Sequence, residues 1–304
     1  MSSEYPLVSV VITTVGSDYV LKAVNSAKSQ TYQNIEIIVC YDGAQFDSFE
    51  EKITSEFNGI KILNVGPFNN ANNARQTGIE QANGEFIALL DDDDYWSELH
   101  IQLNVQEALN YKHRDIVLVS NSVIIENGKE TKVLPERYFE PEKESVVEYL
   151  FFQKNNKKTL MQTSSFFFNK EVGLRCPFDR TLTLHQDYDW IIRVDEMKDI
   201  LIKQTKLNTS FYVLDINQNS ISKKSKAINS IFWAEKMLKN YSPKINFLFY
   251  RRNTLWFLRN ENLIERILLT KLASKKLNIG KIYEIYLIGL CIYGYLKMKI
   301  KSGY

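Results

Sequence analysis

Apolar residues follow two alternating patterns along the first hundred positions. β-branched runs predict strands over 7–14, 35–40, 60–65 and 85–90, and apolar residues at helical spacing predict helices over 19–30, 48–57 and 72–82. Alternating strands and helices favour right-handed βαβ units. We therefore expect an α/β fold with a mainly parallel central sheet that carries helices on both faces.

The pattern is less regular further along the chain. A helix is predicted over 98–115, strands over 116–134 around a turn at Asn127–Gly128, and another helix over 144–152.

Polar residues follow three of the predicted strands. "TTVGS" (13–17) follows the first strand, "YDG" (41–43) the second and "DDDD" (91–94) the fourth. Ligands of parallel sheets bind beyond the carboxyl ends of the strands, so Thr14, Asp42 and the four aspartates should converge on one edge. For Asp42–Gly43, favourable turn chemistry is an alternative explanation.

The four adjacent aspartates need compensation. Two carboxylates about 4 Å apart repel by roughly 4 kcal/mol at an effective dielectric constant of about 20. The sequence contains neither a dinucleotide-binding glycine motif nor a P-loop. A divalent cation bridging one or two aspartates to substrate phosphates fits this pattern, with Arg75 as a second cationic group. The alternatives are an acidic turn in water and a solvated arginine.

A second acid cluster opens a predicted helix in "TLTLHQDYDWIIRV" (181–194). Acids such as Asp187 and Asp189 interact favourably with the dipole of a first helical turn, so helix capping is one explanation. A carboxylate facing the first cluster could instead act as a general base. His185 is either a competing base or a residue that flanks the helix.

The first hundred residues resemble the nucleotide-binding half of a family 2 glycosyltransferase with the GT-A fold, on "LVSVVITT", "SAKSQTYQNIEIIVCYDGA" and "NNARQTGIEQANGEFIALLDDDDYW". The resemblance implies a nucleotide-sugar donor, usually a UDP-sugar, with Mn²⁺ or Mg²⁺ on its diphosphate. Asp91 and Asp93 match the two acids of the D-x-D motif and are the implied metal ligands. The implied donor-binding residues are Thr14, Asp42, Arg75, Asp91, Asp92 and Asp93.

Several positions depart from the family pattern. Thr13 replaces a proline, and Val15–Gly16 replaces a Tyr-Asn pair. Tyr41 stands where the family has the first acid of a D-D-G-S turn. The resemblance implies that Asp42 reads the nucleobase. These changes loosen that assignment and leave the metal motif intact.

The segment around 186–193 is similar to the family's E-D-Y-D-x-W-x-x-R-like motif. The resemblance implies that Asp187 is the catalytic base, with Gln186 in place of the usual glutamate. Asp189 is assigned a structural or acceptor role. The implied activity is an inverting, metal-dependent hexosyl- or N-acetylhexosaminyltransferase. Its saccharide acceptor would be polyprenyl-diphosphate-linked, in polysaccharide, O-antigen or capsule synthesis.

Net charge is only +2 over 304 residues, but its distribution is uneven. Residues 239–304 hold thirteen Lys or Arg against three acids, which leaves residues 1–238 at −8. This acidic body and the lack of a recognition motif argue against a nucleic-acid partner. We divide the chain into a donor half (1–96), an acceptor half containing the base (97–238) and a basic helical tail (239–304).

The tail interleaves aromatic, aliphatic and basic residues. Its apolar run from Ile285 to Leu296 has twelve residues and is too short for a bilayer core, which needs about twenty. The composition is typical of an interfacial helix on anionic lipid. The alternative is packing on the body or pairing with another subunit, which would make a homodimer.

Two further observations concern location. The start of the chain has no basic region ahead of its apolar stretch, and Cys40, Cys176 and Cys291 form no C-x-x-C motif. We expect a reducing cytoplasmic location, peripheral on the inner face of the cell membrane.

Two other functions remain open. A catalytically inactive GT-A-like partner in a membrane glycan assembly complex would keep the fold, although retention of Asp91, Asp93 and Asp187 favours an enzyme. A nucleotidyltransferase would need a glycine- and lysine-rich phosphate loop near the first strand, and that loop is missing from the sequence.

Overall fold

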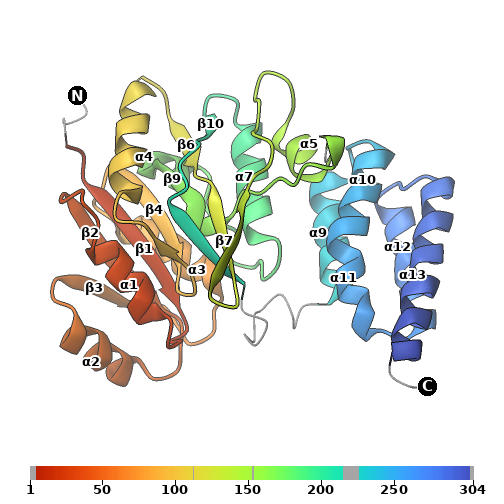
Figure 1. The fold of residues 1–304 in the computed structure, drawn as a ribbon, viewed down its shortest axis with the longest axis horizontal. Helices are drawn as coiled ribbons and strands as arrows, with labels where there is room; N and C mark the ends of the chain where they lie inside the picture. The colour runs from red at the N-terminus through yellow and green to blue at the C-terminus, as the bar shows by residue number, and fades with distance from the viewer. Residues whose placement is uncertain (1–4, 112, 153, 215–225, 302–304) are drawn as a thin grey trace. The chain divides into compact units, whose positions relative to one another are not determined.

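The computed structural model describes residues 5–111, 113–152, 154–214 and 226–301 (Figure 1). The chain divides into two compact units, Met1–Asn217 and Gln218–Tyr304. All described strands belong to the first unit, and the described part of the second unit is helical.

The main sheet of the first unit has seven strands in the order β10-β6-β9-β4-β1-β2-β3. Strands β1 to β4 are mutually parallel, as predicted, and β9 runs antiparallel between β4 and β6. The strands are β1 (Val8–Thr14), β2 (Ile35–Tyr41), β3 (Ile60–Asn64), β4 (Phe86–Asp91), β6 (Ile116–Val119), β9 (Phe166–Asn169) and β10 (Leu201–Gln204).

Helices cover both faces of this sheet, because successive side chains of a strand point to opposite faces. Val10 and Ile12 of β1 share a core with the apolar faces of α1 (Val20–Lys28), α2 (Phe46–Glu56) and α4 (His100–Ala108). On the other face, Gly78 of α3 (Ala71–Gln81) lies so close to Val11 that an added Cβ would be 2.4 Å from that side chain. The predicted helix over 98–115 is too long, because α4 ends at Ala108 and a 3-10 turn, Leu109–Tyr111, follows.

A smaller sheet has four strands in the order β5-β11-β7-β8. They are β5 (Tyr95–Trp96), β7 (Ser122–Glu126), β8 (Lys129–Leu134) and β11 (Ser210–Leu214). The predicted turn between β7 and β8 is confirmed, with positive φ at both Asn127 and Gly128. Strand β4 ends at Asp91 and β5 begins at Tyr95, so the chain passes from one sheet to the other through the aspartates.

The described part of the first unit also contains α5 (Val146–Phe151), α6 (Lys170–Arg175) and α7 (Gln186–Glu196). Helix α7 is anchored by Trp190, which is fully buried and stacks on Phe178 with ring centroids 4.8 Å apart. This packing fixes the first turn of α7, where Asp187 lies.

The second unit contains α9 (Ala227–Leu238), α10 (Pro243–Phe249), α11 (Leu255–Phe257), α12 (Leu263–Lys276) and α13 (Lys281–Lys301). Helix α9 belongs to this unit, so the helical region starts before residue 239, where the sequence pattern placed the tail. Among the described residues, no helix combines the length and apolar character that crossing a membrane requires.

Candidate active site

The carboxyl ends of β1, β2 and β4 meet at one edge of the main sheet. Thr13 is paired with Asp91 across β1 and β4, and Thr14 is paired with Tyr41 across β1 and β2. Thr13 Oγ1 donates to Asp91 Oδ1 at 3.1 Å. The predicted convergence of the three strand ends is therefore present.

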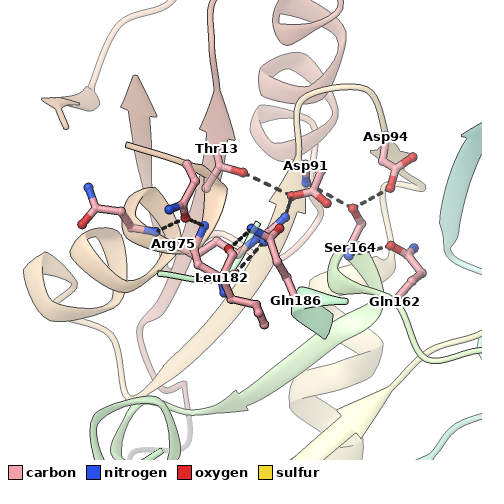
Figure 2. Close-up of polar contacts among 11 residues, drawn as sticks. Thr13, Arg75, Asp91, Asp94, Gln162, Ser164, Leu182 and Gln186 are labelled. Atoms are coloured by element: carbon pink, nitrogen blue, oxygen red, sulfur yellow. Dashed lines mark hydrogen bonds and ion pairs between the residues drawn. The ribbon is translucent and has the colours of Figure 1, made fainter. Parts of the chain in front are cut away.

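Arg75 connects this edge to helix α7. Its guanidinium is buried on α3, and Nη2 donates to Asp91 Oδ1 at 2.6 Å. Nη1 donates to Gln186 Oε1 at 3.0 Å and to Asn72 Oδ1 at 3.1 Å. Figure 2 shows Thr13 and Arg75 both directed at Asp91, with Gln186 on the far side of the guanidinium. One arginine thus joins the D-x-D segment to the start of α7.

Asp92 turns toward the end of β1. Its Oδ2 accepts hydrogen bonds from the hydroxyls of Thr14 and Ser17. Gly16, at φ +92°, takes a left-handed conformation in this turn and donates its N–H to Thr14 Oγ1 at 2.8 Å. Burial raises the pKa of Asp92, and the two hydroxyl donors partly oppose that rise. Asp92 and Thr14 therefore stabilise each other's position in this turn.

Asp93 is the least compensated of the four aspartates. Burial raises its pKa to about 7, and the neighbouring charges of Asp91 and Asp92 add to the rise. No hydrogen bond or ion pair to Asp93 comes from another side chain among the described residues. A bound positive charge would favour the ionised carboxylate, so Asp93 is suited to hold a cation.

The residues present fit a hard divalent ion. No three candidate ligands of the described chain come together as a closed metal site. Mg²⁺ is commonly held by one or two carboxylates together with substrate phosphates, so a closed site is not required. Asp93 and the Oδ2 atom of Asp91 are the oxygens available for such an ion, and their role as metal ligands stays a prediction.

Asp94 has a structural role. Its side chain is buried, Oδ2 accepts from Ser164 Oγ at 2.6 Å, and Oδ1 accepts from the N–H of Val213 at 2.9 Å. Ser164 Oγ in turn accepts from the N–H of Asp91 at 3.1 Å, as Figure 2 shows. Burial raises the pKa of Asp94 well above its ordinary value, and the charge of Asp93 adds to the rise. Asp94 thereby connects the end of β4 to β11 of the smaller sheet.

Ser164 and its neighbour Gln162 carry no signal in the sequence that singles them out. Gln162 Oε1 accepts from the N–H of Ser164 at 2.9 Å and so holds the 3-10 turn that presents the serine. Both residues precede the apolar strand β9 in a run of small polar residues, and only the fold brings that run beside Asp91.

The carboxylate of Asp42 accepts hydrogen bonds from the backbone. Its two carboxylate oxygens accept from the N–H groups of Asn69 and Asn70, both at 2.8 Å, and the side chain is buried. These bonds hold the loop that leads into α3, where Arg75 lies. The predicted contact of Asp42 with a nucleobase stays a prediction beside this structural role.

Asp187 lies in the first turn of α7, next to the Gln186 that Arg75 contacts. Burial raises the pKa of Asp187, the charge of Arg75 opposes the rise and the charge of Asp91 adds to it. The second acid cluster is therefore electrostatically coupled to the first. A raised pKa makes a carboxylate a stronger base, which suits the predicted role.

Three other ionisable residues near Asp187, which are Asp189, His185 and Tyr212, differ from it in their surroundings. Asp189 is buried and pairs with Arg193 one turn along α7, at 2.8 Å, in agreement with a structural role. His185 precedes α7 at φ +59°, and burial lowers its pKa to about 3. Burial raises the pKa of Tyr212 of β11, and the charges of Asp94, Asp187 and Asp93 add to the rise. Tyr212 is therefore close enough to both acid clusters to be affected by their charge.

The two aromatic residues after the aspartates pack against other rings of the fold, with Trp96 buried and Tyr95 half-buried. Trp96 is buried, stacks on His100 with ring centroids 4.3 Å apart, and donates its indole N–H to the carbonyl of Ser164 at 2.7 Å. Tyr95 stacks on Phe211 at 4.7 Å. Both rings therefore stabilise the joint between the two sheets.

Comparison with known proteins agrees with this fold. The sequence model of the family described as "Glycosyl transferase family 2" matches residues 9–182. The "Amylovoran biosynthesis glycosyltransferase AmsB" of Erwinia amylovora is 30% identical over 233 residues, which cover 73% of this chain and 74% of that relative. The chain therefore belongs to glycosyl transferase family 2, as its resemblance predicted.

A shorter match is found with the "UDP-Glc:alpha-D-GlcNAc-diphosphoundecaprenol beta-1,3-glucosyltransferase WfgD" of Escherichia coli. It is 27% identical over 124 residues, which cover 39% of this chain and 49% of that relative.

Among solved structures, residues 1–349 of S. aureus TarS in complex with UDP-GlcNAc are similar in fold. The TM-score is 0.61 at 13% identity, with 98% of this chain and 92% of that chain covered. The predicted GT-A fold is confirmed.

Proposed function

We propose that this chain is an inverting transferase that moves a sugar from a nucleotide-sugar, with a UDP-sugar as first choice, to a hydroxyl of a lipid-linked saccharide. The observation that carries the proposal is the position of Arg75 between Asp91 and Gln186. It connects the D-x-D segment to the turn that holds Asp187. A donor held at the D-x-D segment would therefore present its anomeric carbon to an acceptor hydroxyl that Asp187 deprotonates.

The donor assignment is supported by family membership and by the names of similar proteins. WfgD is named for a UDP-Glc donor, and TarS was crystallised with UDP-GlcNAc. On this chain, the oxygens of Asp91, Asp92 and Asp93 stand at the edge where donors of parallel sheets bind, and Arg75 supplies a positive charge beside them.

The reaction requires one proton transfer and one exchange of bonds. Asp187 accepts the proton of the acceptor hydroxyl while that oxygen attacks the anomeric carbon from the face opposite the diphosphate. The bond between the anomeric carbon and the diphosphate oxygen breaks, and the nucleoside diphosphate leaves with the electron pair. An α-linked donor then gives a β-linked product.

The leaving diphosphate accumulates negative charge that must be offset. Asp93 and Asp91 would hold Mn²⁺ or Mg²⁺, which when bound supplies Lewis-acid stabilisation of the leaving group. Arg75 orients Asp91 through its 2.6 Å contact. The hydroxyls of Thr14 and Ser17 hold Asp92 at the same edge of the sheet. The D-x-D segment is therefore ordered before the donor binds.

The acceptor proposal rests on relatives. WfgD is named for a saccharide on diphosphoundecaprenol, and AmsB for biosynthesis of amylovoran. A hydroxyl of a polyprenyl-diphosphate-linked saccharide is the corresponding acceptor class for this chain. Such an acceptor would place the enzyme at the cytoplasmic membrane surface.

The proposal is tested with a panel of UDP-, GDP- and dTDP-sugars, each with and without Mn²⁺ or Mg²⁺. A donor that binds the native state raises the unfolding temperature, and that donor is then offered with lipid-linked saccharides. We expect one UDP-sugar to stabilise the chain only with metal and to yield a β-linked product. A retained configuration would contradict inversion, and donor binding without transfer to any acceptor would favour the inactive GT-A-like partner.

A further inference from the structure

Helix α13 exposes a continuous apolar stripe. Its exposed members are Ile282, Ile285, Tyr286, Ile292, Tyr293 and Leu296, with 83, 63, 49, 38, 64 and 53% of their surface accessible. With Gly289, which is also exposed, they recur every three to four residues and therefore share one face. The fourteen helical steps from Ile282 to Leu296 make this stripe about 21 Å long.

The opposite face of α13 is already occupied. Leu287 and Cys291 are buried, and Tyr283 stacks on Phe247 of α10 with ring centroids 4.4 Å apart. The packing of the second unit thus leaves the outward stripe uncovered while its inner face is filled. An exposed apolar surface of this extent on a helix marks an interaction site.

Positive charge flanks the stripe. By helical position, Lys281 and Lys297 stand at its two edges, and both are exposed. The single acid of the helix, Glu284, is 14% exposed and pairs with Lys281 at 3.1 Å. Across the whole second unit the sequence holds seventeen Lys or Arg and four acids, a net of +13. The partner that fits is apolar at its centre and anionic at its rim.

We propose that α13 lies flat in the headgroup region of an anionic bilayer, with this stripe directed toward the acyl chains. Apolar side chains on one face with lysines at the border are the features of an interfacial helix. Tyrosine rings suit the boundary between acyl chains and headgroups, and lysine stems reach back to the lipid phosphates. A second copy of the chain fits less well, because two units of +13 repel each other.

Membrane binding of this kind explains how the chain reaches a lipid-linked acceptor, and only that consequence rests on the proposed function. The binding itself needs neither donor nor acceptor. A chain that binds vesicles but transfers no sugar would contradict the proposed function alone.

The test is co-sedimentation of the full chain with vesicles of phosphatidylcholine, alone or mixed with an equal part of phosphatidylglycerol. We expect binding to the mixed vesicles, weaker binding to the neutral vesicles, and a fall of mixed-vesicle binding toward the neutral level in high salt. The combined substitutions Ile285→Gln, Tyr293→Gln and Leu296→Gln should lower the partition coefficient by about tenfold or more.

Two matched variants complete the experiment. Leu174→Gln replaces an exposed leucine, 43% accessible, on α6 of the first unit. This control should leave vesicle binding unchanged. The double variant Lys281→Gln, Lys297→Gln should bind the anionic vesicles more weakly than the wild type. Its binding to the neutral vesicles should equal that of the wild type.

Three outcomes would overturn the proposal. They are a triple variant that binds like the wild type, a wild type that binds neither vesicle, and a dimer in ultracentrifugation that the triple variant converts to a monomer without vesicle binding. Circular dichroism on each variant verifies the helical fold.

Discussion

Arg75 and Asp91 form an ion pair in which Nη2 lies 2.6 Å from Oδ1, with 6% of the arginine side chain and 27% of the aspartate side chain exposed. The pair is well packed on the arginine side and open on the aspartate side. A second carboxylate oxygen of Asp91 therefore remains available for a ligand while the first is held in place.

Arg75→Met should destabilise the folded chain by about 1–3 kcal/mol, because it leaves Asp91 and Gln186 without their common donor. The matched control is Arg180→Met, which removes an exposed ion pair with Glu80 and should cost about 0–1 kcal/mol. Urea unfolding at constant pH measures both. Equal losses in the two variants would contradict the central position of Arg75.

Asp187→Asn should lower turnover by roughly 10²–10⁴-fold, because an amide cannot accept the proton of the acceptor hydroxyl. Donor binding should survive, since the D-x-D segment is unchanged. Glu196→Gln removes an exposed acid from the same helix and serves as the control for lost charge. Turnover at the level of the wild type in the Asp187 variant would refute its role as base.

Asp93→Asn should abolish metal-dependent donor binding. Calorimetry with UDP and Mn²⁺ measures the loss, and Glu98→Gln, an exposed acid just beyond the cluster, should bind normally. Wild-type affinity in the Asp93 variant would show that the ion, if bound, is held elsewhere.

Asp93 also predicts a pH dependence. Its pKa is about 7 in the folded chain against an ordinary value of 3.8, so the native state binds this proton more tightly than the unfolded state. The stability contributed by the proton is present below about pH 4 and is lost as the pH rises through about 7. Without metal, Asp93→Asn should therefore be more stable than the wild type at pH 8 by about 1 kcal/mol or more, with a smaller difference at pH 5. Mn²⁺ with UDP should reverse that order at pH 8. Thermal unfolding at the two pH values, showing no such trend, would contradict the raised pKa.

Asp94→Ala should destabilise the chain by about 2–4 kcal/mol, because the Ser164 hydroxyl and the Val213 N–H both lose a buried partner. Asp94→Asn should cost less, since its amide oxygen can still accept from Val213 and its amide N–H can donate to Ser164. Guanidinium unfolding of the two variants provides the comparison. A larger loss for the asparagine variant would mean that Asp94 must be ionised.

Much of the fold is readable from the sequence because each early element has a clear apolar pattern. The elements between residues 7 and 91 lie within two residues of their predicted bounds, since β-branched runs such as 35–40 become buried strands. The prediction over 98–115 is too long, because beyond Tyr111 the sequence "KHRD" offers no apolar side chain to the core face.

The D-x-D segment shows the limit of local sequence. Asp91, Asp92, Asp93 and Asp94 are chemically identical, yet one pairs with an arginine, one with two hydroxyls, one with no other described side chain and one with a serine and a backbone N–H. Their partners come from β1 and the turn after it, from α3, from β11 and from the turn before β9. No spacing rule within "DDDD" could predict which aspartate has which partner.

The sequence by itself determined the alternating strands and helices, the end of β4 as the place of the carboxylates, and the family. These depend on apolar periodicity and short motifs, which act over a few residues. The tertiary structure alone decided that Arg75 bridges Asp91 to Gln186, that Asp94 accepts hydrogen bonds from Ser164 and Val213 while no other described side chain bonds to Asp93, and that one face of α13 stays uncovered. Those outcomes depend on contacts between residues far apart in the chain, and burial and charge act on a side chain only after such contacts have formed.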